Sequence, residues 1–153
     1  TCNVGIMDGD AILYLDRVES NFPLRAELQP GSRVPLHCTG LGKLLLAHLP
    51  GRTRKRVLKR LKLDRHTDNT ITDREILNEE CDRIRKQGFA INNEEYHEGI
   101  ISVAVPVHAE NGNTISGLAI HAPAARLSIE GAIALVPRLK PYADEIAGDL
   151  LED

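Results

Sequence analysis

The chain has 153 residues, of which 42% are hydrophobic and 27% charged, and this length fits one domain with a core of its own. Its formal net charge of −3 argues against a surface devoted to nucleic-acid phosphates, which needs a basic excess. The three cysteines form no CxxC pair, which is typical of free thiols in a reducing cytoplasm. No apolar run reaches the roughly 20 residues of a membrane span. We therefore expect a cytoplasmic protein without contact to a membrane.

Two segments near the start of the chain have the alternating pattern of strands. Residues 11–18 (AILYLDRV) and 22–28 (FPLRAEL) alternate apolar and polar side chains, and Pro30-Gly31 ends the second segment. This pattern predicts two strands of one hairpin.

Residues 31–49 (GSRVPLHCTGLGKLLLAHL) place glycines directly before an apolar helix, which we predict over residues 41–48. Thr39 can cap this helix, while Gly40 and Gly42 leave its first turn uncovered by side chains. The free N–H groups there carry the positive end of the helix dipole, so the pattern indicates a site for a small anion. Ordinary turn formation is the alternative explanation of these glycines.

Two more helices are predicted before the next strands. The first covers residues 52–61 and turns its apolar residues to one face, while its many lysines and arginines form a solvated face. The second begins at a capping box, TDRE over residues 72–75, and ends at Gly88. Its predicted apolar face consists of Ile76, Leu77, Cys81 and Ile84.

The remaining chain predicts strands followed by a helix. Residues 100–108 and 114–122 read as antiparallel neighbours joined by a turn at residues 110–113 (ENGN). Residues 129–151 are amphipathic, and their two prolines must start, kink or divide the helix there. Strands, helices, strands and a helix follow one another without a βαβ repeat. This order predicts an α+β fold in which helices flank an antiparallel sheet.

Several spaced blocks, taken together, make the chain similar to one known family. They are PLHCTGLGKLLLA at residues 35–47, GFAINNEE at 88–95, GIISVAVPV at 99–107 and AIHAPAAR at 119–126. The chain resembles the effector-binding domain of the IclR family of bacterial transcriptional regulators. The resemblance implies a GAF-like sheet flanked by helices over residues 1–153, with the winged helix-turn-helix domain missing from this chain.

The resemblance also implies a set of effector-binding residues. In the family, the first amides of the helix hold the carboxylate of a small effector, an Asp or its equivalent contacts a hydroxyl or keto oxygen, and strand residues line the pocket. On the entering hairpin strand, Leu24, Ala26 and Leu28 share one face and would supply apolar pocket wall, as would Val34, with an ordinary core position as the alternative for each. The matching ligand-binding positions are Gly40, Leu41, Asn92, Ile100, Ser102, Ala119, His121, Val34 and Ala26.

Three of these positions depart from well-known family members. Ala119 and His121 stand where those members carry two serines, and Asn92 stands where Asp is frequent. The exchanges remove a hydroxyl, introduce an imidazole and remove a charge. They favour a larger or aromatic acid over glyoxylate or pyruvate. For Asn92 a turn, and for His121 a satisfied histidine at a strand end, are equally weighted alternatives.

The functional hypothesis is a ligand-sensing domain that binds a small carboxylate effector and forms homodimers or tetramers. Contact with DNA would occur only through the missing N-terminal domain. One alternative is an enzyme with Ser102 or Cys38 as nucleophile and His121 or His37 as base, which no motif supports. Another is an oligomerisation module with an empty pocket. The six histidines lack metal-ligand spacing, so neither a metal nor a cofactor is predicted.

Overall fold

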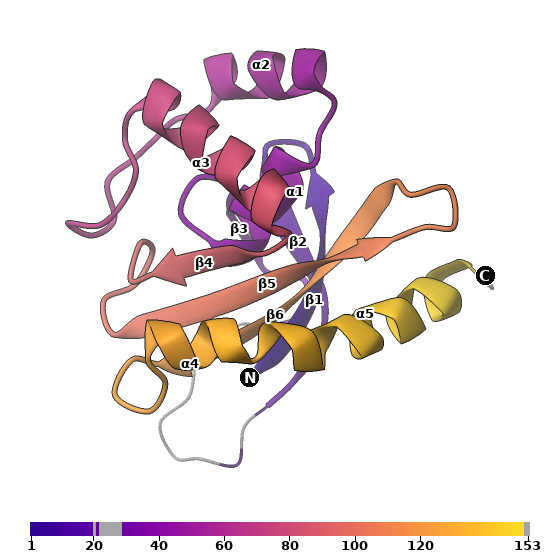
Figure 1. The fold of residues 1–153 in the computed structure, drawn as a ribbon. Helices are drawn as coiled ribbons and strands as arrows, with labels where there is room; N and C mark the ends of the chain where they lie inside the picture. The colour runs from indigo at the N-terminus through magenta and orange to yellow at the C-terminus, as the bar shows by residue number, and fades with distance from the viewer. Residues whose placement is uncertain (20, 22–28, 152–153) are drawn as a thin grey trace.

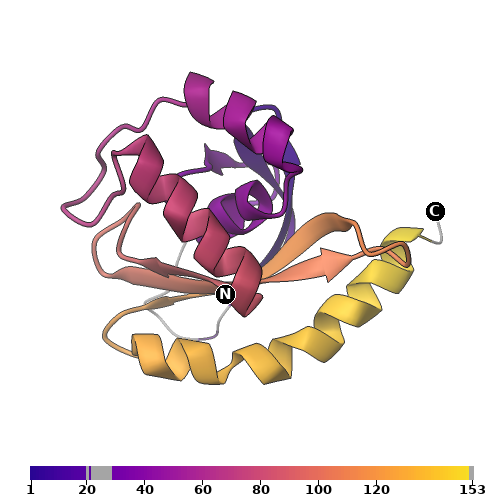
Figure 2. The ribbon, with the colours of Figure 1, turned by 45° about the horizontal axis from the view of Figure 1, so that its top comes forward.

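The computed structural model describes residues 1–19, 21 and 29–151, which form a single antiparallel sheet between two layers of helices (Figures 1 and 2). The strands follow one another across the sheet in the order β3-β2-β1-β6-β5-β4, and every neighbouring pair is antiparallel. Their bounds are β1 (Cys2–Asp8), β2 (Ala11–Val18), β3 (Arg33–Pro35), β4 (Ala90–Asn93), β5 (Ile100–His108) and β6 (Thr114–Pro123). This architecture confirms the predicted α+β fold. The strand predicted over residues 22–28 lies outside the described residues.

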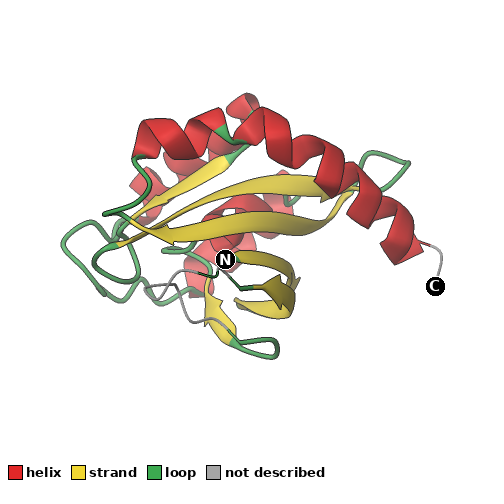
Figure 3. Ribbon diagram, turned by 90° about the horizontal axis from the view of Figure 1, so that it is seen from below, coloured by secondary structure: helices red, strands yellow, loops and turns green. Residues whose placement is uncertain are grey.

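The helices divide between the two faces of the sheet. One face carries α1 (Gly40–Ala47), α2 (Gly51–Arg60) and α3 (Arg74–Gln87), and the other carries α4 (Ile129–Ala134) and α5 (Val136–Leu151). Figure 3 shows α5 running alongside β5 and β6 on its face. In the described part of the chain, no helix is both long enough and apolar enough to cross a membrane.

Helix α1 lies between the sheet and α3, and all eight of its residues are buried. It approaches the sheet closely because glycines face it from the strands. A Cβ atom placed on Gly117 of β6 would lie 2.5 Å from Leu41 Cδ2, and one on Gly5 of β1 would lie 3.1 Å from Leu41 Cδ1. The first turn of α1 therefore packs directly on the strands, so a ligand site there can include residues of the helix and of the sheet.

The predicted start and face of α3 need two corrections. Asp73, not Thr72, caps the helix, since its Oδ1 accepts hydrogen bonds from the amides of the second and third helical residues. Ile76 is 55% exposed, so its assignment to the apolar face was wrong. Ile76 lies about 100° around the helix axis from Leu77, whereas the buried stripe follows the i, i+4 and i+7 positions that begin at Leu77. The buried members of that stripe are Leu77, Cys81 and Ile84.

The basic run on α2 also differs in one residue from the predicted solvated face. Arg54 is buried, and its Nη1 donates to Asp82 Oδ1 at 2.7 Å while its Nη2 donates to the Ala47 carbonyl at 3.2 Å. It thus joins α2 to α3 and to the end of α1. The apolar residues predicted for the inner face are buried, namely Val57, Leu58 and Leu61.

The C-terminal stretch is divided, as the prolines predict. The break falls at Leu135, between α4 and α5, and Pro137 is the second residue of α5. A proline there loses no intrahelical hydrogen bond, because the first amides of a helix have no partner within it. Pro141 lies inside α5. In the turn between β5 and β6, Gly112 alone takes the positive φ, at 85°.

Candidate functional site

Helix α1 begins with two backbone amides that are free to bind a ligand. The Thr39 hydroxyl caps the helix and accepts a hydrogen bond from the amide of Gly42 at 3.1 Å, as predicted. Among the described residues, nothing accepts a hydrogen bond from the amide of Gly40 or of Leu41. Unpaired amides at a helix start attract anions, because they add hydrogen bonds to the positive end of the helix dipole.

A cross-strand row of polar side chains faces this helix start. Ser102 on β5 pairs with Asn92 on β4 and with His121 on β6. A Cβ atom placed on Gly40 would lie 2.7 Å from Ser102 Oγ, so the start of α1 lies directly over the middle of the row. Directly paired residues of neighbouring strands point to the same face of a sheet. The fold therefore brings together four positions that are distant in the sequence.

Several polar atoms at this place are buried and have no hydrogen-bond partner among the described residues. They are Ser102 Oγ, His121 Nε2 and both side-chain atoms of Asn3, a residue of β1 that pairs with Ala119. Ser102 is 0%, Asn3 1% and His121 3% exposed. Burying a polar group without a partner costs roughly 1–3 kcal/mol, so a cluster of such groups indicates a place where a polar molecule binds.

His121 is a neutral imidazole in this environment. Burial lowers its pKa from 6.5 to about 3, because the charged form loses its hydration. The ring of Tyr14 on β2 meets it edge-on, with 6.1 Å between ring centroids. At neutral pH His121 can therefore offer a donor and an acceptor to a ligand, but no positive charge.

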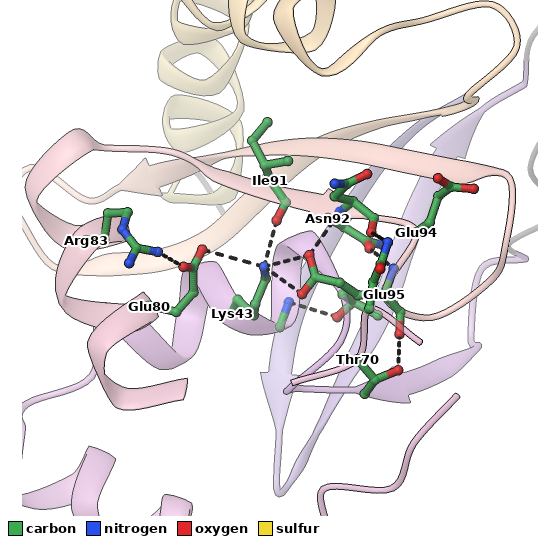
Figure 4. A network of polar contacts seen from close by, with 12 residues as sticks. Lys43, Thr70, Glu80, Arg83, Ile91, Asn92, Glu94 and Glu95 are labelled. Atoms are coloured by element: carbon green, nitrogen blue, oxygen red, sulfur yellow. Dashed lines mark hydrogen bonds and ion pairs between the residues drawn. The ribbon is translucent and has the colours of Figure 1, made fainter. Parts of the chain in front are cut away.

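Asn92 lies in β4, so the alternative interpretation of Asn92-Asn93 as a turn was wrong, although the Asn92 side chain holds the segment that follows the strand. Its Oδ1 accepts from the Glu95 amide at 2.9 Å, and Glu95 Oε2 accepts from the Asn93 amide at 2.9 Å and from Lys43 Nζ at 3.0 Å (Figure 4). Glu95 Oε1 also lies 2.8 Å from Nζ, as an ion-pair contact outside hydrogen-bond geometry. The Asn92 NH2 group makes no hydrogen bond to the described residues, so it is still able to donate.

The other predicted ligand-binding residues lie around this row. Ala119 is fully buried and pairs with Ala104 next to the row, and Ile100 is half-buried at the start of β5. Val34 is buried on β3 against the core that α1 joins. Ala26, together with Leu24 and Leu28, lies outside the described residues.

Asn3 and Tyr14 are two members of this site that the sequence analysis missed. A signal for Asn3 exists in CNVGI, since a polar residue there shares a face with Gly5 inside a strand. Tyr14 shares a face with Ile12 in the second strand, which marks it as buried. What the sequence does not contain is the pairing of β1 with β6, which brings Asn3 beside Ala119.

The site lacks an activated nucleophile among the described residues. Ser102 Oγ has no hydrogen-bond partner, so no base is in contact with its proton. Burial raises the pKa of the Cys38 thiol to about 12, which keeps it protonated at neutral pH. The arrangement suits binding rather than acyl transfer.

A buried polar cluster beside a helix start, on a curled antiparallel sheet, defines a ligand-binding domain of the sensor type. The family described as "Bacterial transcriptional regulator IclR C-terminal" matches residues 1–148. The chain therefore belongs to the IclR family of transcriptional regulators, of which it is the C-terminal effector-binding domain. This confirms the resemblance seen in the sequence blocks.

Individual relatives agree with this assignment. The chain is 45% identical to the "Probable transcriptional regulator SauR" of Cupriavidus necator over 152 residues, which cover 99% of this chain and 60% of that protein. The crystal structure of Thermotoga maritima IclR superposes with a TM-score of 0.89 at 34% identity, covering 97% of this chain and 60% of that one. These relatives are transcriptional regulators, not enzymes. The chain spans three fifths of their length.

Two of the similar structures contain a hydroxybenzoate, and one of the two shares 28% sequence identity with this chain. That structure is a double mutant of the inducer-binding domain of the PobR transcription factor from Acinetobacter, in complex with 3-hydroxybenzoic acid. The TM-score is 0.86 at 28% identity, and the match covers 95% of this chain and 86% of that one.

Proposed function

We propose that this chain senses a small organic acid and that aromatic acids of the hydroxybenzoate class are its ligands. The observation that carries the proposal is the set of buried, unpartnered polar atoms opposite the two free amides of α1. The complex of the PobR domain with 3-hydroxybenzoic acid supports the ligand class. A hydroxybenzoate has a carboxylate on one side of the ring and a hydroxyl further round it, which fits a site with anion-binding amides at one end and neutral polar side chains at the other.

In the proposed complex, the carboxylate accepts hydrogen bonds from the amides of Gly40 and Leu41. Ser102, which lies against the helix start, donates to the same carboxylate, while His121 and Asn3 bind the distal hydroxyl, and each regains a hydrogen bond that it lacks in the free protein. Because His121 is neutral, selectivity for an acid comes from the helix start and not from an ion pair.

The proposed output is a change in quaternary arrangement of the whole regulator in the cytoplasm. A ligand shifts such an equilibrium only by its difference in affinity for the two states. We infer that dimers or tetramers of this domain position DNA-binding domains supplied by a part of the protein outside this chain. The share of the SauR relative that the chain spans, 60%, leaves room for such a domain.

Calorimetric titration and thermal unfolding with 3-hydroxybenzoate, benzoate and methyl 3-hydroxybenzoate test the proposal. We expect the two acids to bind and the uncharged ester to bind at least about tenfold more weakly, since the ester lacks the anion. An acid present at about a hundredfold over its Kd should stabilise the domain by about 2.7 kcal/mol. If no acid binds, or the ester binds as tightly as the acid, the proposal is wrong.

The helix start is tested by one pair of glycine variants. In Gly40→Ala the new methyl group meets Ser102 Oγ, so the path of the carboxylate narrows, and we expect at least about tenfold weaker binding. Gly148→Ala on α5 is the matched control, because a Cβ atom there has no neighbour within 4 Å. Equal affinities in both variants, with circular dichroism showing both folded, would contradict the proposed role of Gly40.

A further inference from the structure

A second cluster of side chains, apart from the effector site, has the composition of a metal site. His37 and Cys38 lie between β3 and α1, and His66 lies between α2 and α3. One ring nitrogen of each histidine and the sulfur of Cys38 lie within 4.8 Å of one another. His37 and Cys38 are buried, whereas His66 is exposed. The fold thus places two nitrogen donors and one sulfur donor around one point, although His66 is 28 or more residues away from the other two in the sequence.

The spacing of the three atoms is close to that of bound zinc ligands. With Zn–N bonds of about 2.0–2.1 Å and Zn–S bonds of about 2.3 Å, the ligand atoms of a tetrahedral site lie roughly 3.3–3.7 Å apart. Side-chain rotations that move the three ligand atoms by about 1 Å would bring them to these distances. Nitrogen and thiolate donors prefer zinc and similar borderline metals over calcium and magnesium, which take oxygen ligands.

A hydrogen bond to the main chain holds the His37 ring in place. His37 Nε2 lies 2.8 Å from the carbonyl oxygen of Asp64. A carbonyl only accepts, so Nε2 carries the proton and Nδ1 has the lone pair that a metal needs. Ligating histidines commonly donate their second N–H to a carbonyl in this way.

The loop that carries His66 is fixed by hydrogen bonds of its own. The His66 amide donates to Thr70 Oγ1 at 3.0 Å, and this hydroxyl donates to the Glu95 carbonyl at 2.7 Å. The ring of Tyr96 meets the His66 ring edge-on, with 4.9 Å between centroids. His66 is therefore presented to the cluster by a loop tied to the residues that follow β4.

We infer that His37, Cys38 and His66 bind one zinc ion per chain, with a fourth coordination position open to water on the exposed side of His66. The metal would take the sulfur as thiolate and release one proton on binding. The site is independent of the effector proposal, because it shares none of the residues assigned to the organic acid. It lies immediately before Thr39, so the metal would hold the segment that caps α1.

Titration of the metal-free, reduced chain with cobalt(II) chloride and then zinc chloride tests this inference. We expect one cobalt ion per chain with a thiolate-to-cobalt charge-transfer band, which zinc abolishes by displacement. Cys38→Ser should remove the band, and the exposed His66→Ala should weaken zinc binding at least about tenfold. Cys2→Ser and His108→Gln are matched controls that remove a thiol and an imidazole elsewhere, and each should keep the band.

Two results would overturn the inference. The first is the absence of a thiolate band in the unmodified chain at saturating cobalt, which needs no variant. The second is a zinc affinity that is equal in the unmodified chain and in His66→Ala, with thermal unfolding showing that the variant is folded. Because His66 is exposed, its truncation leaves the core intact, and loss of binding cannot be attributed to unfolding.

Discussion

His121 should make the stability of the domain depend on pH in a direction that its burial dictates. In the folded chain burial lowers its pKa to about 3, whereas the ordinary value of 6.5 applies to the unfolded chain. Between these two values the unfolded state binds a proton that the folded state does not. Stability is therefore complete above the unfolded pKa and falls as the pH decreases through that window.

The size of the effect follows from the difference between the two pKa values. One pKa unit corresponds to about 1.4 kcal/mol, and about 1.5 units separate pH 5 from the unfolded pKa. Lowering the pH from about 7 to about 5 should thus remove about 2 kcal/mol through His121 alone. This is a large share of the roughly 5–15 kcal/mol that stabilises a typical domain.

Urea unfolding at both pH values, for the unmodified chain and for His121→Gln, measures this contribution. Other histidines also respond to acid, so the relevant quantity is the difference between the two proteins in their loss of stability. We expect His121→Gln to lose about 2 kcal/mol less than the unmodified chain, whatever its stability at pH 7. His108→Gln, at an exposed position on the same hairpin, is the matched control. Equal losses in His121→Gln and the unmodified chain would refute the reasoning.

Two predictions concern the core around α1. Gly42→Ala should destabilise the domain by roughly 3 kcal/mol in urea unfolding, because its Cβ would lie 2.4 Å from the rigid Leu36 carbonyl oxygen; Gly51→Ala, with no neighbour within 4 Å, should change stability little. An equal effect of both alanines would contradict the clash. Lys43→Met should cost roughly 3–5 kcal/mol by leaving the Glu95 carboxylate buried without its cation, and adding Glu95→Gln should recover part of the loss. A double-mutant cycle with no coupling would show that the ion pair does not stabilise the fold.

The fold could be predicted largely from local patterns. Alternation in AILYLDRV, the turn at ENGN and the glycine that ends α3 each fix a local structure, and the order of elements fixes the class. The two errors in α3 have different causes: Thr72 and Asp73 are adjacent capping candidates, whereas Ile76 lies beside the i, i+4, i+7 stripe of Leu77, Cys81 and Ile84 and not on it. Periodicity alone does not decide between Thr72 and Asp73.

The candidate site could be predicted only where a local motif marks it. The helix start at Gly40 has such a motif, and the alternation of β5 and β6 places Ser102 and His121 on one face. Two features depend on contacts between distant segments and cannot be predicted from spacing in the sequence. They are the place of Asn3 beside Ala119 and the cluster of His37, Cys38 and His66. The burial of Arg54 was missed for the same reason, since its partners lie on other helices.

The position of Ser102, Ala119 and His121 on regular strands has an evolutionary consequence. The ladder hydrogen bonds join main-chain atoms only, so a side chain in the middle of a ladder can be exchanged without removing the hydrogen bonds that hold the strand. Under the proposed function, descendants of one ancestral regulator acquire new inducers through a few codon changes in β5 and β6, while the scaffold is inherited unchanged.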